Sequence, residues 1–214
     1  MTQSWNVLCL GDSYTIGEGL EAADSFPHLL KDLLKERGPD GVCGGKELSV
    51  KVVAKTGWTT DELAEAIDSE KEASGFLSLP YDAVTLLIGV NNQYRGKEKG
   101  YDLSRYQAEF PPLLDTAIAF AGGDYSKIRV LSIPDWGLTT FGQKSGRDTS
   151  VISTELDEYN KFASELSSNK GIKFIDVTTL SREVGPDASY LVEDGLHYSK
   201  RFNLEVAQKV AETI

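Results

Sequence analysis

Five short apolar runs alternate with longer stretches in which apolar residues recur every three or four positions, and this alternation constrains the fold most. The apolar runs are Val7–Leu10, Val50–Ala54, Ala83–Gly89, Ile128–Pro134 and Ile172–Val177. The helical patterns are Ser25–Glu36, Thr60–Glu72, Ser104–Ala121, Val151–Ser167 and Ser199–Glu212. Short strands that alternate with helices of this length are typical of a parallel sheet covered by helices on both faces. The sequence therefore predicts an α/β fold.

Local signals refine this prediction. Residues 84–88 are apolar except Thr85, which is expected for a central strand that is covered on both sides. Pro111-Pro112 interrupts the third helical pattern, so that helix is predicted to be kinked or to begin late. Thr60 and Ser199 are expected helix N-caps.

The chain has 214 residues, of which 40% are hydrophobic and 26% charged, as in ordinary globular proteins. A chain of this size buries roughly 70% of the surface that it exposes when unfolded. No repeat, low-complexity tract or linker divides the sequence. We therefore expect a single domain over residues 1–214.

The formal net charge of -11 argues against several partner classes. Nucleic-acid binding requires a Lys/Arg footprint, and the sequence has no basic block. Stable association with an anionic membrane is disfavoured for the same reason, and no basic amphipathic helix is visible. A small-molecule partner is expected. The oligomeric state is left open.

Cysteine content and the N-terminus bear on localisation. Cys9 and Cys43 are the only cysteines, and two free thiols are typical of a reducing compartment. The N-terminus has no basic segment followed by a long apolar one, because the first strand begins almost at once. These features predict a cytoplasmic protein, although a secreted chain whose signal peptide had been removed would look the same.

In open parallel sheets, ligands bind at the carboxyl ends of the strands. The segments expected there are Gly11–Glu18, Lys55–Thr59, Asn91–Gly96, Asp135–Ser150 and the segment that ends at His197. These segments are predicted to surround one crevice.

The chain has two histidines, His28 and His197. His28 lies in the first turns of a predicted helix, where a packing role is expected. His197 follows Asp194 by three residues across a glycine-containing turn. A carboxylate there can accept the Nδ1 proton and leave Nε2 free to act as a base, although such pairs also occur by chance on surfaces.

Other crevice residues could complete an acyl-transfer site. Ser13 follows the first strand and precedes a helix, where a nucleophile would be exposed, although serines also cap helices there. The Gly57 N–H and the Asn91 amide follow the next two strands, as turn residues or as oxyanion donors. No Gly-Lys-Ser/Thr follows Ser13, so a Walker-type phosphate loop is excluded.

Together these residues resemble the four sequence blocks of the SGNH (GDSL-type) hydrolases, a family of esterases and lipases that act as acylhydrolases. The matching residues, in the family's order and rough spacing, are Gly11-Asp12-Ser13, Gly57, Gly89-x-Asn91 and Asp194-x-x-His197. The resemblance runs from the first strand to the last helix.

The resemblance implies a three-layer α/β/α sandwich with a five-stranded parallel sheet, which is flavodoxin-like in outline. It implies that Ser13 is the nucleophile, that His197 shuttles the proton and that Asp194 orients His197. The Ser13 N–H, the Gly57 N–H and the Asn91 side chain would form the oxyanion hole. The family uses no metal or organic cofactor.

The sequence departs from the family pattern at two positions. Asn92 stands where many members carry aspartate, and we interpret it as a changed brace of the loop that leaves Asn91 usable. Tyr14 stands where many members carry an aliphatic residue, and it would line the pocket.

Aromatic residues fall in or beside the predicted crevice. Tyr14, Trp58, Tyr94 and Trp136 are the expected substrate-binding residues, and Phe141 lies nearby. Aromatic walls suit an acyl chain or a sugar ring, while some of these rings would simply pack the loop bases. The segment 135–150, rich in glycine and threonine, is a candidate flexible lid.

The sequence thus predicts a serine ester hydrolase that acts through an acyl-enzyme, on a short-acyl or carbohydrate ester. One alternative is a non-catalytic carbohydrate- or acyl-ligand-binding protein on the same scaffold. An acyltransferase with the same triad is another. A flavodoxin-like nucleotide binder that uses the Gly11–Gly19 loop is a third, but it gives no role to Asp194 and His197.

Overall fold

A computed structural model describes residues 4–38, 40–74, 80–96 and 99–214 of the chain. The first three residues, on which the localisation prediction partly rests, lie outside these ranges.

Five strands form one parallel sheet in the order β2-β1-β3-β4-β5. The strands are β1 (Ser4–Gly11), β2 (Glu47–Ala54), β3 (Ala83–Leu87), β4 (Ile128–Leu131) and β5 (Lys173–Ile175). From β1 the chain first adds β2 on one side and then crosses to add β3 on the other. The carboxyl ends of β1 and β3 therefore form a topological switch point, where ligands bind in sheets of this kind.

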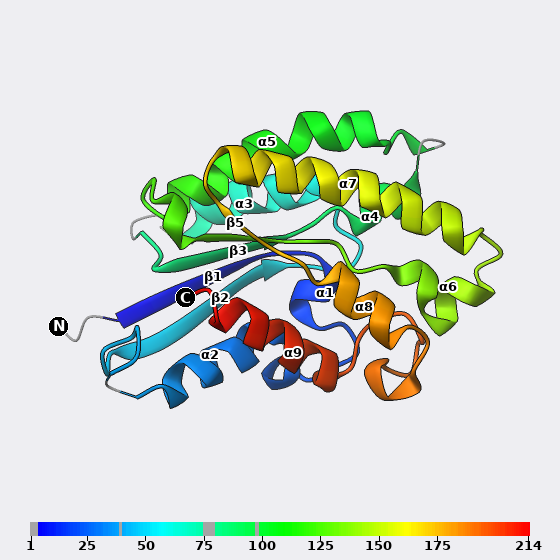
Figure 1. The fold of residues 1–214 in the computed structure, drawn as a ribbon. Helices are drawn as coiled ribbons and strands as arrows, with labels where there is room; N and C mark the ends of the chain where they lie inside the picture. The colour runs from blue at the N-terminus through cyan, green and yellow to red at the C-terminus, as the bar shows by residue number, and fades with distance from the viewer. Residues whose placement is uncertain (1–3, 39, 75–79, 97–98) are drawn as a thin grey trace.

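Helices cover both faces of the sheet (Figure 1). One layer contains α3 (Thr60–Ser74), α5 (Leu103–Phe120) and α7 (Thr149–Asn169), and the opposite layer contains α2 (Phe26–Glu36) and α9 (Lys200–Ala211). The shorter helices are α1 (Ser13–Ile16), α4 (Val90–Arg95), α6 (Thr140–Lys144) and α8 (Thr178–Val184). The short 3-10 helices are η1 (Ala22–Asp24), η3 (Tyr125–Lys127), η4 (Trp136–Leu138) and η5 (Ala188–Tyr190). The predicted three-layer α/β/α architecture is confirmed.

The central strand has the predicted character. Every residue of β3 is buried, including Thr85, because helices cover the strand on both sides. Several strands end earlier than the apolar runs do. β3 ends at Leu87 and β4 at Leu131, so Gly89 and Pro134 already belong to the turns at the carboxyl edge.

Helix α5 corrects one prediction, because it begins at Leu103 and runs through Pro111 and Pro112. A proline removes the N–H that would bond to the carbonyl four residues earlier. The two carbonyls affected, at positions 107 and 108, lie on exposed residues, where water can replace the lost donors. The late start is therefore wrong, and the kink that was its alternative stays a prediction.

The two predicted N-caps have different outcomes. Helix α3 begins at Thr60, so Thr59 rather than Thr60 precedes it, and the Thr59 N–H donates to Glu62 Oε2 at 3.0 Å. Ser199 does occupy the N-cap position of α9, but its hydroxyl donates to the Ser189 carbonyl at 2.8 Å instead of capping the helix.

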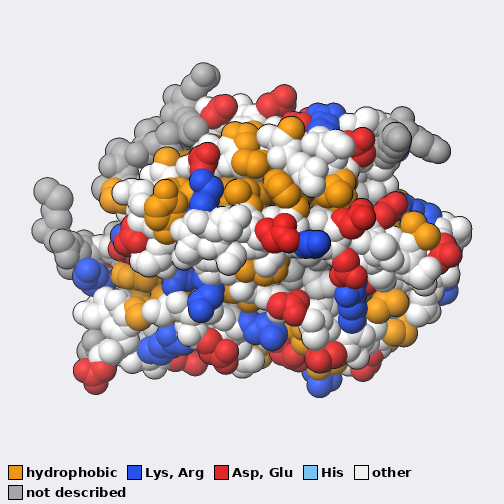
Figure 2. All heavy atoms as spheres, turned by 45° about the horizontal axis from the view of Figure 1, so that its top comes forward, with side chains coloured by type: hydrophobic (Ala, Val, Ile, Leu, Met, Phe, Trp, Pro, Cys, Tyr) orange, Lys and Arg blue, Asp and Glu red, His pale blue; other side chains and the backbone are white. Residues whose placement is uncertain are grey.

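Figure 2 shows acidic, basic and hydrophobic side chains interspersed on the face that carries α5 and α7. Within the described residues, none of the helices combines the length and apolar character that crossing a bilayer requires. The cytoplasmic localisation stays a prediction.

Candidate active site

Ser13 lies where the chain leaves the sheet after β1, as the first residue of α1. A Cβ at Gly11, two residues before Ser13, would lie 2.1 Å from Thr15 Oγ1 and 2.4 Å from the Leu87 carbonyl, so only glycine fits this turn. The N–H groups of a helix's first turn have no acceptor within the helix. The Ser13 N–H is therefore available for an external acceptor, beside a hydroxyl on a side chain that is 5% exposed.

Asp12, next to Ser13, is buried in the turn, and its Oδ1 accepts the Tyr14 N–H at 3.0 Å. Among the residues that the structure describes, no donor reaches its Oδ2. Burial disfavours the charged carboxylate and raises the pKa of Asp12 to about 7, although the hydrogen bond from Tyr14 opposes this. Asp12 thus fixes the backbone around Ser13 from inside the protein.

His197 lies in the turn before α9 and is paired with Asp194. Its Nδ1 lies 2.6 Å from Asp194 Oδ2, while Asp194 Oδ1 accepts the N–H groups of Leu196 and His197 at 2.7 and 2.9 Å. Partial burial opposes ionisation of Asp194, but these hydrogen bonds outweigh it and hold the pKa below its ordinary value. An ionised Asp194 fixes the tautomer that carries hydrogen on Nδ1 and leaves Nε2 as the free base.

Contacts from other segments hold this turn in place. The Gly195 carbonyl accepts both the Thr140 hydroxyl at 3.0 Å and the Phe141 N–H at 2.9 Å, at the start of α6. Gly195 has φ +68°, and a Cβ there would lie 2.2 Å from Thr140 Oγ1. The turn therefore requires glycine for its conformation and for this close approach.

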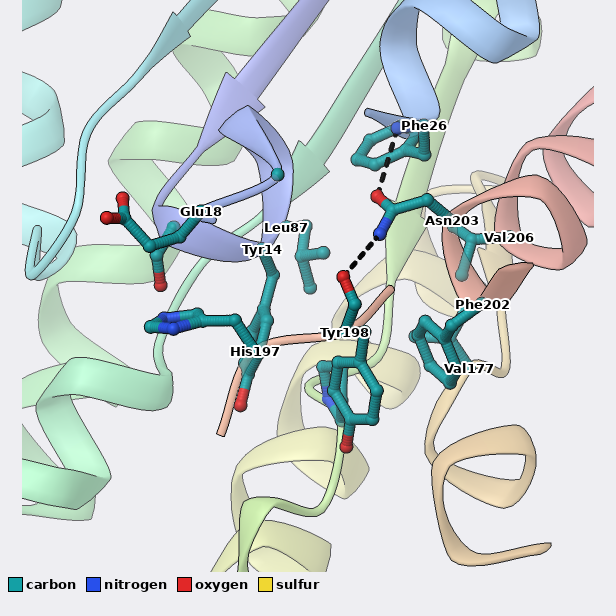
Figure 3. Close-up of a pocket in the computed structure, with 13 residues that line it drawn as sticks. Tyr14, Glu18, Phe26, Leu87, Val177, His197, Tyr198, Phe202, Asn203 and Val206 are labelled. Carbon is teal, nitrogen blue, oxygen red and sulfur yellow. Dashed lines mark hydrogen bonds between the residues drawn. The ribbon is translucent and has the colours of Figure 1, made fainter. Parts of the chain in front are cut away.

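Asn203 on α9 supports the residue after His197 (Figure 3). Its amide donates to the Tyr198 carbonyl at 3.1 Å, and its Oδ1 accepts the Phe26 N–H at 3.0 Å. Tyr14 packs edge-on against the His197 imidazole, with 5.9 Å between ring centroids. The turn is thus connected to α2, to α9 and to the segment that carries Ser13.

Two further donors lie near the carboxyl ends of β2 and β3. Gly57 has φ +85°, and no heavy atom lies within 4 Å of the position that a Cβ would occupy. The Asn91 amide donates to the Trp58 carbonyl at 2.9 Å. A side-chain amide carries two hydrogens, so this bond orients Asn91 and leaves one hydrogen for a ligand.

Asn92 has the bracing role that the sequence predicted. It is fully buried, its Oδ1 accepts the Thr60 N–H at 3.1 Å, and its amide donates to the Thr60 hydroxyl at 2.8 Å. These bonds connect α4 to the start of α3 and leave Asn91 free of that structural task.

One pocket, with a volume of about 170 Å³, brings most of these groups together. Its lining consists of Ser13, Tyr14, Thr56, Gly57, Val90, Asn91, Tyr94, Trp136, Leu196 and His197. It therefore contains the predicted nucleophile, base and oxyanion donors, with Asp194 bonded to the base. Trp58, a predicted substrate-binding residue, and Phe141 are not part of this lining, and both pack against the hydrophobic core.

Figure 3 shows a second, smaller cavity that adjoins this pocket, since both are lined by Ser13, Tyr14 and His197. Its volume of about 20 Å³ exceeds the roughly 10–15 Å³ that one water molecule needs. Glu18 lines this cavity and accepts the Thr56 hydroxyl. Within the described part of the chain, no group of three or more His, Cys, Asp or Glu side chains could hold a metal ion.

Sequence reasoning did not find all the lining residues. Val90 and Leu196 directly precede Asn91 and His197, and that adjacency was the available signal. The segment 135–150, predicted to be a candidate flexible lid, contains η4 and α6, and Thr140 of α6 donates to the Gly195 carbonyl. The catalytic and oxyanion-hole roles of Ser13, His197, Asp194 and their neighbours stay predictions.

Comparison with known proteins gives a family match. The sequence profile described as the GDSL-like lipase/acylhydrolase family matches residues 9–202. No curated protein sequence matches the chain significantly.

Several solved structures share the fold. A lipase from a goat rumen metagenome superposes with a TM-score of 0.73 at 21% identity, covering 98% of this chain and 97% of that one. A variant of an acetyl xylan esterase from Geobacillus stearothermophilus gives 0.71 at 20% identity, covering 98% and 94%. A lipase/acylhydrolase from Enterococcus faecalis gives 0.68 at 20% identity, covering 97% and 94%. At these identities the likeness establishes the fold.

Proposed function

The chain belongs to the GDSL-like lipase/acylhydrolase family, and from that membership and the site geometry we propose that it hydrolyses carboxylic esters through an acyl-serine intermediate. The observation that carries the proposal is the 2.6 Å contact between His197 Nδ1 and Asp194, because His197 lines the same pocket as Ser13. A base oriented in this way beside a serine is the arrangement that acyl transfer requires.

In the first half-reaction, the Ser13 oxygen attacks the ester carbonyl carbon and its proton passes to His197 Nε2. Asp194 stabilises the resulting imidazolium through Nδ1–H. The carbonyl oxygen becomes an oxyanion, for which the N–H groups of Ser13 and Gly57 and the Asn91 amide are the donors. The oxyanion then collapses, the C–O bond to the alcohol breaks, and the alcohol leaves with the proton from His197.

In the second half-reaction, water takes the place of the alcohol. His197 removes a proton from the water as its oxygen attacks the acyl carbon, and the same donors stabilise the second oxyanion. Collapse breaks the bond to Ser13, whose oxygen recovers the proton from His197, and the carboxylic acid is released.

The pocket favours a small ester. Its volume of about 170 Å³ is below the roughly 300–1,000 Å³ that is usual for sites of drug-sized ligands. Apolar side chains make up much of its wall, among them Val90, Tyr94 and Trp136. One similar fold belongs to an acetyl xylan esterase. We therefore include short-acyl esters, among them acetylated carbohydrates, in the proposal.

A substrate panel tests the proposed function. The purified protein is assayed on p-nitrophenyl esters from acetate to palmitate and on acetylated sugars, beside Ser13→Ala. The wild type should turn over the short esters, and Ser13→Ala should lower kcat by roughly 10⁴-fold or more. Ser126→Ala, in the turn before the opposite end of β4, is the matched control and should retain full activity. Full activity in Ser13→Ala would exclude the proposed mechanism.

A further inference from the structure

We infer that Trp136 sets the length limit of the acyl group, so that the enzyme accepts acyl chains of a few carbons and rejects longer ones. This inference rests on the proposed ester hydrolysis and assigns to one side chain the selection among esters. Trp136 follows β4, lines the pocket with Ser13 and His197, and is only 1% exposed. Trp136 therefore bounds the pocket with a small part of its surface, and protein encloses the rest of the side chain.

Four contacts fix the indole in place, and one of them is the Phe141 ring, whose centroid lies 6.2 Å from that of the indole. Its Nε1–H donates to Gln93 Oε1 at 2.8 Å, and both side chains are buried. The Tyr94 ring packs edge-on against it with 5.2 Å between centroids, and the Arg147 guanidinium lies 5.3 Å from the indole ring centroid. Rotation of the indole out of the pocket would leave a buried N–H without its acceptor, which is unfavourable.

The groups that hold Trp136 are themselves connected. Gln93 Nε2 donates to Glu155 Oε2 at 2.6 Å, and Arg147 Nη2 lies 3.3 Å from the same carboxylate. Arg147 Nη1 also donates to the Tyr94 carbonyl at 3.2 Å. Helix α4, helix α7 and the segment between α6 and α7 are thus joined around the indole, and the wall is rigid.

The chemistry indicates which half of the ester meets this wall. The departing alcohol must take its proton from His197, so it lies beside the imidazole, against which Tyr14 packs. The carbonyl oxygen faces the donors at Gly57 and Asn91. The part of the pocket bounded by Val90, Tyr94 and Trp136 then remains for the acyl chain.

The test measures kcat/KM along two substrate series with Trp136→Leu. The acyl series is p-nitrophenyl acetate, butyrate, hexanoate and octanoate, and the alcohol series is methyl, butyl and hexyl acetate. In the wild type, kcat/KM should fall beyond butyrate. In Trp136→Leu, the hexanoate-to-acetate ratio should rise about fourfold for each newly buried methylene, since each contributes about 0.8 kcal/mol. The hexyl-to-methyl ratio should not change.

Two further variants keep the test decisive. Tyr125→Leu changes an exposed aromatic ring on η3, at the opposite end of β4 and outside the pocket lining, and it should leave the acyl ratio unchanged. If Trp136→Leu does not fold, Gln93→Met replaces it, because this variant keeps the indole and removes its acceptor. The loosened wall should then raise the hexanoate-to-acetate ratio several-fold.

The outcomes separate this inference from the proposed function. Absence of wild-type activity on every ester overturns both. Wild-type activity on acetate with an unchanged acyl ratio in Trp136→Leu or in its replacement overturns the role of Trp136 alone. A change confined to the alcohol series also overturns it, because it would place the alcohol against Trp136.

Discussion

The two halves of the site are held in different ways. Ser13 lies at the end of β1 with its turn buried beneath it, and the neighbouring Asp12 is 1% exposed. His197 lies in a turn outside the sheet, paired with an Asp194 side chain that is 43% exposed. The sheet and close packing position the nucleophile. Hydrogen bonds position the base or its turn: Asp194 accepts from His197, and Thr140 and Asn203 donate to carbonyls of the turn.

Substitutions around Ser13 and around His197 are therefore expected to differ in their effects on stability. Changes around Ser13 act on a buried, tightly packed turn, so they affect stability as well as turnover. Changes around His197 act on a more exposed turn, so they affect turnover with little loss of stability.

The largest effect is expected at His197, whose side chain should matter for turnover and not for stability. His197→Ala should lower kcat by about 10²–10⁴-fold, because it removes the general base, and should leave the thermal midpoint almost unchanged. His28→Ala is the control, since His28 contacts Ser25 on α2, away from the pocket. Steady-state kinetics and thermal melts of both variants check this prediction. Equal activity losses for the two histidines would contradict the assignment.

Two adjacent asparagines of α4 are predicted to have different roles. Asn91→Ala should lower kcat by about 10²–10³-fold if its amide binds the oxyanion. Asn92→Ala should instead destabilise the fold by about 1–3 kcal/mol, because it leaves buried groups of Thr60 without partners. Kinetics and denaturant unfolding of both variants separate the two roles. A stability loss with normal kcat in Asn91→Ala would make it a turn residue.

The pH dependence of the free energy of unfolding tests the burial of Asp12, which lies beside Ser13. Burial raises its pKa to about 7 from an ordinary 3.8, so the folded state keeps a proton that the unfolded state loses. Its stabilising contribution is full below the unfolded pKa and is lost as pH rises through about 7. Asp12→Asn should therefore gain stability relative to wild type between pH 4 and 8, by a few kcal/mol, since a tenfold change in proton affinity is about 1.4 kcal/mol.

Denaturant unfolding at several pH values measures this difference. Asn can still accept the Tyr14 N–H, so the variant should fold. A difference in the free energy of unfolding that does not vary with pH would show that Asp12 titrates normally.

The smallest expected effect concerns the clamp on the His197 turn. Thr140→Val removes the hydroxyl that donates to the Gly195 carbonyl but keeps the Phe141 N–H on the same oxygen. Loss of one such bond is worth about 0.5–1.5 kcal/mol, so kcat should fall about threefold to tenfold while KM changes little. Thr154→Val, on the exposed side of α7, is the control. If the free energy of unfolding falls by as much as the activation free energy of turnover rises, Thr140 acts only in packing.

The sequence was sufficient to predict the features that depend on the pattern of apolar residues and on the order of the motifs. Apolar runs located all five strands, and the order of the motifs placed Ser13, Gly57, Asn91 and His197 at one edge of a sheet. Periodicity also located α5, whereas the proline signal misjudged where it begins, because the helix tolerates two prolines that leave carbonyls unpaired on exposed residues.

Other features depend on contacts between segments that are distant in the chain. The bond from Thr140 to Gly195 spans 55 residues, and the bond from Phe26 to Asn203 spans 177. The Gln93 acceptor of Trp136 lies 43 residues away. No local pattern marks such partners, so the clamp on His197 and the wall of the pocket became visible only in the folded chain.

Covalent labelling with a fluorophosphonate, followed by peptide mass spectrometry, tests whether Ser13 is a nucleophile that His197 activates. A single adduct is expected on Ser13, and it should form at least about 10²-fold more slowly in His197→Ala because the base that activates the hydroxyl is missing. An adduct on another residue, or labelling of Ser13 at the same rate without His197, would contradict this expectation.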